Sequence, residues 1–271
     1  MFGALFGDII GSYYEIHCTN DYDFEFKRES TFTDDSVLTC AVAKAILLNG
    51  DDTGHIRQRA KEYAIQYKQY YSYFPHAGYG NMFSEWAKNP NNMHKVRSYG
   101  NGGAMRAVPI GYAYGTMEQI LLQAKASCLY THNSRKAIKG AQAVASAVWL
   151  AVHGETKENI RDFISRKFRY NLSFRLNDIK SWYAFDSSTD YSVPPAIVAF
   201  LEAYDYESAV RNAVSLGGDA DTMACIAGGI AEAYYKVIPK HIQQFCYSRL
   251  DYTLKSTATE FCKKYSIDSF G

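Results

Sequence analysis

Apolar residues recur every three or four positions along most of the chain, which is the spacing of amphipathic helices. No run of alternating Val, Ile and Thr bounded by hairpin turns is present, so strands are not expected. The sequence predicts an all-α protein with ten or more helices, built as a single compact, orthogonal helical domain over residues 1–271. Helices are expected over residues 2–16, 37–48, 54–74, 82–87, 117–130, 137–151, 196–204, 207–214, 223–234, 240–252 and 254–265.

The first predicted helix carries a glycine at every fourth position: Gly3, Gly7 and Gly11. One face of this helix therefore has no side chains, and another helix or a ligand can approach it closely. Glu15 ends the run. A glutamate at a helix end is usually solvated and has no specific role. A functional role for Glu15 is the alternative.

Residues 155–190 form the most polar stretch and are expected to hold short helices and a loop over 185–190. Pro194 and Pro195 are expected to begin the helix that follows, because proline is tolerated in the first turn.

Composition excludes several classes of protein. The formal net charge is +1, which argues against a nucleic-acid binder. The six cysteines are scattered without a C-x-x-C pair, which indicates a reducing compartment and favours a cytoplasmic protein. Asp8 interrupts the apolar N-terminal run, so a secretory signal is not expected, and no stretch has the length of a membrane span.

The most informative stretch is Gly217-Gly218-Asp219-Ala220-Asp221-Thr222. Two glycines allow a tight turn, and a small-residue helical run follows. Asp219 and Asp221 at a helix start are able to hold a hard cation. The alternative is an ordinary capped helix with one aspartate at the N-cap.

A second acidic helix start lies at Thr33-Asp34-Asp35-Ser36. Adjacent residues point about 100° apart on a helix, so the two carboxylates would serve two neighbouring ions rather than one. An N-cap with acidic residues in the first turn is again the alternative.

The third stretch is the glycine-rich turn over residues 98–103. Consecutive amide N–H groups in such a turn form a concavity suited to a phosphate or pyrophosphate. It is neither a dinucleotide-binding fingerprint nor a P-loop. His132 begins a later helix and is able to orient a ligand hydroxyl or phosphate, although a structural hydrogen bond is the commoner role.

These stretches together indicate a two-metal site. Four converging carboxylates repel one another, and two divalent cations would neutralise them. All-oxygen donors select Mg²⁺ or Mn²⁺. With a pyrophosphate-sized turn beside it, the expected substrate is a nucleotide diphosphate with reactive sugar hydroxyls.

Five motifs occur in order along nearly the whole chain: residues 3–8 with 11–15, 32–36, 100–106, 131–132 and 217–222. In this order they resemble the ADP-ribosylglycohydrolases, the family of dinitrogenase-reductase-activating glycohydrolase and the ADP-ribosyl-acceptor hydrolases. The resemblance implies an all-α fold, a binuclear Mg²⁺ or Mn²⁺ centre in a central cleft, and a monomer. The implied metal ligands are Thr33, Asp34, Asp35, Asp219, Asp221 and Thr222.

The resemblance also implies how the substrate binds. The turn formed by Ser98, Tyr99, Gly100, Asn101, Gly102 and Gly103 would hold the ADP-ribose diphosphate, and His132 would contact the substrate. Glu15 lies in a context similar to that of the branch that releases ADP-ribose from serine, from poly-ADP-ribose or from O-acetyl-ADP-ribose, in which this glutamate gates the metal site. Ser36 and Gly103 replace the Thr and Ser common in the family, and neither change removes a ligand.

The expected activity is hydrolysis of the bond between ADP-ribose and an acceptor: a serine or arginine side chain of a modified protein, or O-acetyl-ADP-ribose. Asp34, Asp35, Asp219 and Glu15 are the candidate catalytic residues, and one aspartate or Glu15 would be the general base. Two alternatives remain: a two-metal nucleotide pyrophosphohydrolase, and a non-catalytic ADP-ribose-binding member of the family.

Overall fold

The structure is a computed structural model that describes residues 1–50, 55–268 and 270. Over this part of the chain it contains helices and connecting turns and no strand, which confirms the predicted all-α class. The helices are α1 Phe2–Ile16, α2 Asp34–Asn49, α3 Ile56–Tyr73, α4 Asn81–Lys88, α5 Val108–Ala113, α6 Met117–Cys128, α7 Arg135–Val152, α8 Lys157–Phe168, α9 Leu176–Ile179, α10 Thr189–Glu202, α11 Tyr206–Val214, α12 Ala220–Tyr235, α13 Lys240–Tyr247 and α14 Tyr252–Lys264, with a 3₁₀ turn, η1, at Asn101–Gly103.

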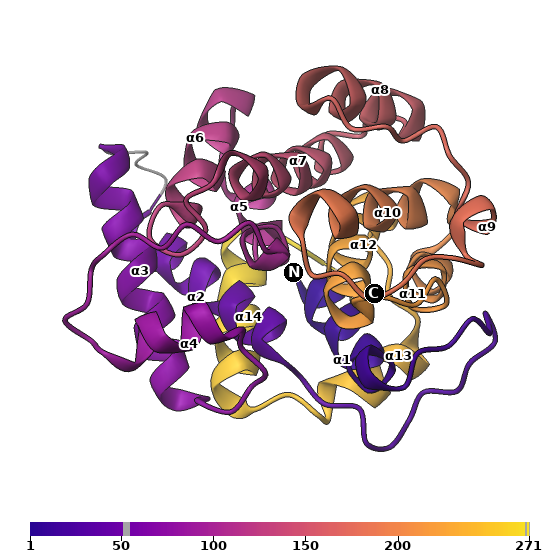
Figure 1. Cartoon of the computed structure of the whole chain (residues 1–271), viewed down its shortest axis with the longest axis horizontal. Helices are drawn as coiled ribbons and strands as arrows, with labels where there is room; N and C mark the ends of the chain where they lie inside the picture. Colours follow the sequence, from indigo (N-terminus) through magenta and orange to yellow (C-terminus); the bar gives the residue numbers. More distant parts are fainter. Residues whose placement is uncertain (51–54, 269, 271) are drawn as a thin grey trace.

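Helices α1 and α12 lie side by side near the centre of the molecule (Figure 1), and both are largely buried. The expectation that a partner approaches the glycine face of the first helix is confirmed. A Cβ atom added at Gly3, Gly7 or Gly11 would lie 2.5, 2.0 or 2.5 Å from the carbonyl oxygens of Gly228, Ala224 and Ala220, respectively. The backbones of α1 and α12 are therefore in direct contact at all three glycines.

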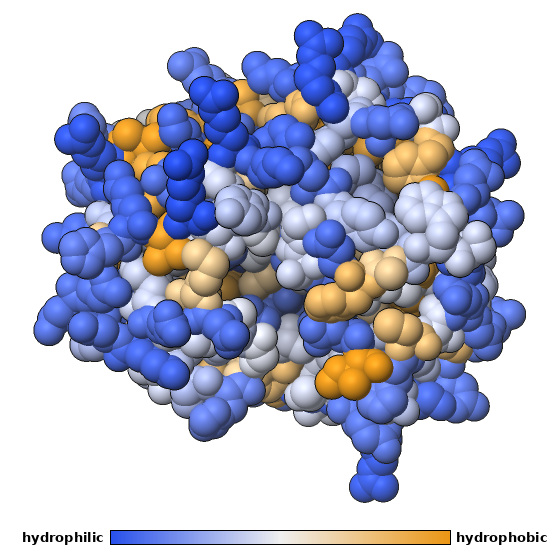
Figure 2. Space-filling view, viewed as in Figure 1, coloured by the Kyte–Doolittle hydropathy of each residue, from blue (hydrophilic) through white to orange (hydrophobic). Residues whose placement is uncertain are grey.

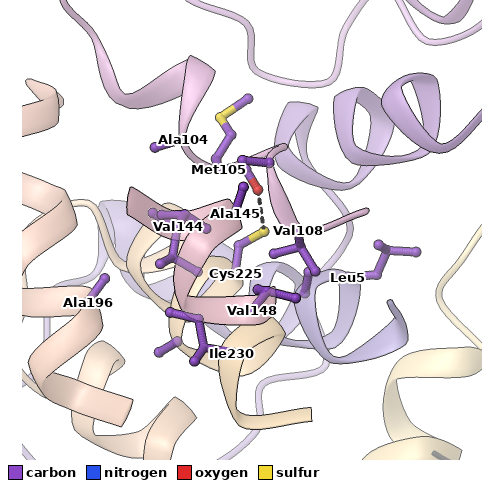
Figure 3. Close-up of a cluster of buried hydrophobic side chains, with 14 of the residues drawn as sticks. Leu5, Ala104, Met105, Val108, Val144, Ala145, Val148, Ala196, Cys225 and Ile230 are labelled. Atoms are coloured by element: carbon purple, nitrogen blue, oxygen red, sulfur yellow. Dashed lines mark hydrogen bonds between the residues drawn. The ribbon is translucent and has the colours of Figure 1, made fainter. Parts of the chain in front are cut away.

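The hydrophobic core surrounds this helix pair (Figure 3). Leu5 of α1, Val148 of α7 and Ile230 of α12 are fully buried in it. The thiol of Cys225 in α12 donates a hydrogen bond to the backbone carbonyl of Met105, at 3.4 Å. This contact ties the centre of α12 to the segment that leads from η1 into α5.

The start of α10 differs from the prediction. The helix begins at Thr189 rather than at the two prolines, so the predicted loop over 185–190 ends two residues earlier. Both the amide and the hydroxyl of Thr189 donate to the carbonyl of Tyr99, which fixes this end. Pro195 has no N–H for the carbonyl of Tyr191, and the hydroxyl of Tyr183 donates to that carbonyl instead, at 3.1 Å.

The polar stretch is also more regular than expected, because α8 occupies twelve of its residues. Thr156 caps this helix with its side chain, which accepts from the amide of Asn159. The helix predicted over 240–252 ends at Tyr247. Residue 54, where the prediction placed the start of the third helix, lies outside the described residues.

The surface seen in Figure 2 is mostly hydrophilic, with apolar residues in small separate patches. None of the described helices is both long enough and apolar enough to cross a membrane.

The α1–α12 contact makes a direct prediction for Gly7→Ala. The added methyl group would clash with the backbone carbonyl of Ala224. A backbone group cannot avoid such a clash by changing rotamer, as a side chain can. We expect the free energy of unfolding to fall by about 1–3 kcal/mol, measured by urea denaturation, even though alanine favours helix. Gly115→Ala is the control, because nothing lies within 4 Å of its added Cβ. Equal stability of the two variants would contradict the close approach.

Candidate metal centre and active site

The contact between α1 and α12 brings acidic residues of the two helices together. Carboxylate oxygens of Asp8, Asp35 and Asp221 lie within 4.8 Å of one another, and so do those of Glu15, Asp219 and Asp221. The two groups share Asp221, so they form one continuous acidic site. Asp8, Asp35, Asp219 and Asp221 are buried, and Glu15 is partly buried.

Asp8 is a residue of this site that the sequence reasoning did not select. Its carboxylate accepts from the amide and hydroxyl of Thr33, at 3.0 and 2.7 Å, and from the amide and hydroxyl of Ser36. It therefore caps the start of α2 from another helix. The sequence does contain a feature that could have identified Asp8: it is a charged residue inside an apolar run with regularly spaced glycines. A carboxylate that is buried in this way requires hydrogen-bond donors or cations.

The first acidic turn is shaped by Thr33, whose extended backbone and side-chain oxygen form the N-cap of α2. The hydroxyl of Thr33 accepts from the amide of Asp35 and donates to Asp8. Asp34 and Asp35 then diverge as expected for adjacent helix positions. Asp35 joins the group with Asp8 and Asp221, whereas Asp34 is only partly buried and faces Gly78, whose added Cβ would lie 3.7 Å from Asp34 Oδ1.

The two acidic turns meet in space. The hydroxyl of Thr222 donates to Asp35 Oδ2 at 3.2 Å, although the two residues are 187 positions apart in the sequence. The other oxygen, Asp35 Oδ1, is buried and has no hydrogen-bond partner among the described residues. An unpartnered buried carboxylate oxygen in an all-oxygen donor set fits a hard divalent cation.

The second acidic turn depends on its two glycines. Gly217 and Gly218 have φ angles of 81° and 75°, in the left-handed region that glycine adopts without strain. The ring of Tyr183 packs so closely on Gly218 that an added Cβ would lie 2.5 Å from it. Tyr183 therefore packs against the outer side of the turn. This contact helps to fix the positions of Asp219 and Asp221 at the start of α12.

The glycine-rich turn lies next to the acidic residues. The side-chain amide of Asn101 donates to Asp219 Oδ2 at 2.7 Å and to Ser192 Oγ at 3.0 Å. The expectation of a run of free amides needs correction: the amide of Gly100 donates to Ser98 Oγ, and that of Asn101 donates to the carbonyl of Ser187. These two N–H groups stabilise the turn itself and are not free for an anion.

A cavity of about 340 Å³ lies over the acidic residues, within the range of small-molecule sites. Eleven of the residues selected from the sequence line it: Glu15, Asp34, Asp35, Ser98, Gly100, Asn101, Gly102, His132, Asp219, Asp221 and Thr222. Three others do not. Thr33 lies behind the acidic site against Asp8, the side chain of Tyr99 is largely exposed, and Gly103 is buried against Cys128.

The cavity wall also contains residues that the sequence did not point to. Gly78 comes from the segment that leads into α4, Asn81 and Met82 are the first residues of α4, and Phe185 comes from the segment before α10. No motif marks these positions, because they reach the cavity only through the packing of distant segments.

Burial dominates the electrostatics of the site. It raises the pKa of Asp8 from 3.8 to about 6, against the opposing hydrogen bonds from Ser36 and Thr33. Burial, then repulsion from Asp221 and Asp8, raises the pKa of Glu15 from 4.5 to about 7. Burial, followed by repulsion from neighbouring carboxylates, also raises the pKa values of Asp34, Asp35 and Asp221 well above the usual range. Bound cations would remove this repulsion.

Comparison with known proteins gives a consistent result. The sequence model of the ADP-ribosylglycohydrolase family matches residues 1–266. The ADP-ribosylhydrolase ARH3 of Homo sapiens is 28% identical over 334 residues, which cover 96% of this chain and 92% of that protein. An uncharacterized protein of Archaeoglobus fulgidus is 32% identical over 157 residues, which cover 51% of this chain and 50% of that protein.

The fold is shared as well. A solved structure described as an ADP-ribosylglycohydrolase-related protein complex superposes with a TM-score of 0.70, covering 98% of this chain and 96% of that chain at 24% identity. The likeness extends over almost the whole of both chains.

The raised pKa values predict how stability depends on pH. A folded state with raised carboxyl pKa values binds more protons than the unfolded state, so stability falls as pH rises from about 4 to about 7. For Asp8 alone the change is about 3 kcal/mol. We expect urea denaturation in EDTA to show lower stability at pH 8 than at pH 5, and Mg²⁺ or Mn²⁺ to restore it at pH 8.

Asp8→Asn should flatten this pH dependence, since it removes one titrating group of the site. Asp23→Asn, in an exposed loop, should leave the dependence unchanged. If stability in EDTA instead rises between pH 5 and pH 8, burial does not raise the pKa values of these carboxyl groups and the prediction is wrong.

Proposed function

The chain belongs to the ADP-ribosylglycohydrolase family, and we propose that it hydrolyses the glycosidic bond between ADP-ribose and an acceptor, which would reverse ADP-ribosylation. The observation that carries this proposal is the continuous acidic site at the base of a cavity whose wall includes the glycine-rich turn and His132. An acidic site able to hold cations, beside a turn typical of phosphate sites, suits a substrate with both sugar hydroxyls and a diphosphate.

We propose that the site takes two Mg²⁺ or Mn²⁺ ions. Their proposed ligands are Thr33, Asp34, Asp35, Asp219, Asp221 and Thr222. When bound, such cations would anchor the 2′ and 3′ hydroxyls of the distal ribose and polarise a water molecule. The buried carboxylates and the orphaned oxygen of Asp35 support this assignment.

The chain's own residues would carry the proton and orient the substrate. Glu15 is partly buried, its pKa is raised to about 7, and it lies beside Asp219 and Asp221. It is therefore suited to take a proton from the attacking water, and an aspartate of the site is the alternative base. As water adds to C1″, the bond from C1″ to the acceptor would break, and the proton taken from the water would be returned to the leaving acceptor atom, so that one water molecule is consumed for each bond cleaved.

Other residues would hold the substrate in place. The turn over residues 98–103 and His132 would bind the diphosphate, with Asn101 fixing the turn relative to Asp219. Positive charge that develops on the distal ribose would be stabilised by the surrounding carboxylates.

The acceptor is part of the proposal. Similarity to the ADP-ribosylhydrolase ARH3 supports hydrolysis of an ADP-ribose linkage. The proposed acceptor is a protein side chain, serine or arginine, or the acetyl group of O-acetyl-ADP-ribose. We propose that the protein acts as a monomer on such conjugates in the cytoplasm, a location supported by its six free cysteines.

The test is release of ADP-ribose from serine-linked and arginine-linked ADP-ribosyl peptides, each with Mg²⁺, with Mn²⁺ and with EDTA. We expect metal-dependent release from one of the two. Asp219→Asn and Asp34→Asn should each lower kcat by about 100-fold or more while the circular dichroism spectrum stays native, because each removes a charge at the reacting sugar. Asp23→Asn is the matched control, since its carboxylate is exposed.

Other products would identify the alternatives. AMP and ribose phosphate would indicate a pyrophosphohydrolase, and ADP-ribose binding without turnover of serine-linked, arginine-linked or O-acetyl conjugates would indicate a non-catalytic member of the family. Full turnover in EDTA would exclude the proposed metal-dependent reaction.

A further inference from the structure

A buried arginine lies directly behind the cavity wall. The side chain of Arg106 is fully buried, and its guanidinium carbon lies 4.1 Å from the centre of the Tyr67 ring. Its Nη2 donates to the carbonyl of Ser127 at 3.0 Å and to the hydroxyl oxygen of Thr131 at 2.6 Å. A guanidinium only donates hydrogen bonds, so the hydroxyl oxygen of Thr131 must be the acceptor in this contact.

The Thr131 hydroxyl is thereby oriented toward its other partner. Thr131 Oγ1 lies 3.0 Å from Nδ1 of His132. One lone pair of this oxygen already receives a short, charge-assisted bond from Arg106, and among the described residues Nδ1 is the remaining partner for the buried hydroxyl hydrogen. Donation of this hydrogen to Nδ1 satisfies both groups, and Nδ1 then carries no proton.

Burial lowers the pKa of His132 well below 6.5, and the positive charge of Arg106 lowers the pKa further, so both effects favour the neutral imidazole. A neutral imidazole carries one N–H, so with Nδ1 as an acceptor the proton resides on Nε2.

Nε2 of His132 faces the glycine-rich turn. A Cβ added at Gly102 would lie 2.7 Å from Nε2, and one at Gly100 would lie 3.9 Å from it. Glycine at position 102 therefore makes room for the ring. Thr131, His132, Gly100 and Gly102 all line the cavity. The Nε2–H group provides a donor at the turn whose amides at Gly100 and Asn101 are already used.

We propose that Arg106 and Thr131 are positioning residues for this site: Arg106 orients the Thr131 hydroxyl, and Thr131 holds His132 as the Nε2–H tautomer, which donates to an anionic oxygen of the ligand at the glycine-rich turn. The identity of that ligand as the diphosphate of ADP-ribose rests on the proposed function. The tautomer does not, because it follows from contacts within the protein.

The tautomer is measured on the ligand-free protein. Long-range proton–nitrogen correlation spectra of ¹⁵N-histidine-labelled protein distinguish Nε2–H from Nδ1–H, and the His132 signals are those lost in His132→Gln. We expect Nε2–H in the wild type. Thr131→Val keeps the shape of the side chain and removes the hydroxyl, so the Nδ1–H form should become populated. Thr131→Ser keeps the hydroxyl and should restore the Nε2–H form.

Binding of ADP-ribose, measured by calorimetry, is the second readout. Loss of one hydrogen bond to a charged oxygen should weaken binding about tenfold in Thr131→Val and leave Thr131→Ser near the wild type. Arg106→Met removes the donor to Thr131 and should populate the Nδ1–H form as well. If that variant does not fold, the two Thr131 variants decide the question alone.

The outcomes separate this inference from the proposed function. A protein that binds and hydrolyses ADP-ribose conjugates but carries the His132 proton on Nδ1 would overturn the inference and leave the function intact. The same holds if Thr131→Val changes neither the tautomer nor the affinity. The expected tautomer in a protein that does not bind ADP-ribose would overturn the function and the donor role, while the positioning by Thr131 would stand.

Discussion

The backbone contact between α1 and α12 is the constraint on which the site depends. Because glycines at positions 3, 7 and 11 leave one face of α1 bare, the backbone of α12 approaches to van der Waals distance. This contact places Asp8 and Glu15 of α1 opposite Asp219 and Asp221 at the start of α12. An alanine at Gly3, Gly7 or Gly11 would place its methyl group against the backbone of α12 and so disturb this contact.

The carboxylates of the site are held in place by hydrogen bonds, although they repel one another. Asp8 caps α2 through four hydrogen bonds, Asn101 holds Asp219, and Thr222 donates to Asp35. Burial first, and then repulsion between the carboxylates, raises the carboxyl pKa values of the site. Buried carboxylates that are held in place by hydrogen bonds, and whose repulsion cations would offset, are the arrangement expected of a metal site.

The site has two sides with different electrostatics. On the α1 and α12 side the groups are acidic and suit cations and sugar hydroxyls. On the side of the glycine-rich turn, the ring of His132 lines the cavity, and the buried cation of Arg106 lies behind it. Such a division matches a ligand that has a neutral sugar at one end and a negatively charged diphosphate next to it.

Local patterns in the sequence were sufficient for much of this protein. Helical periodicity predicted the all-α class, and the glycine spacing in the first helix predicted a close neighbour. The acidic turns were marked by residue types that occur together for few reasons other than capping or metal binding. The start of α10 was wrong, because the side chains of Thr189 and Tyr183 bond to distant backbone groups and override the proline signal.

By itself, the sequence indicated the fold class and the candidate residues of the site, because carboxylates that bind hard cations and glycines that allow tight turns are visible as residue types in a linear pattern. Only the tertiary structure decided how they work together. It joined two acidic turns from opposite ends of the chain, gave Asp8 its role as a cap, used two amides of the glycine-rich turn internally, and placed Arg106 behind His132. Each of these depends on contacts between segments far apart in sequence, and a linear pattern does not contain distances in space.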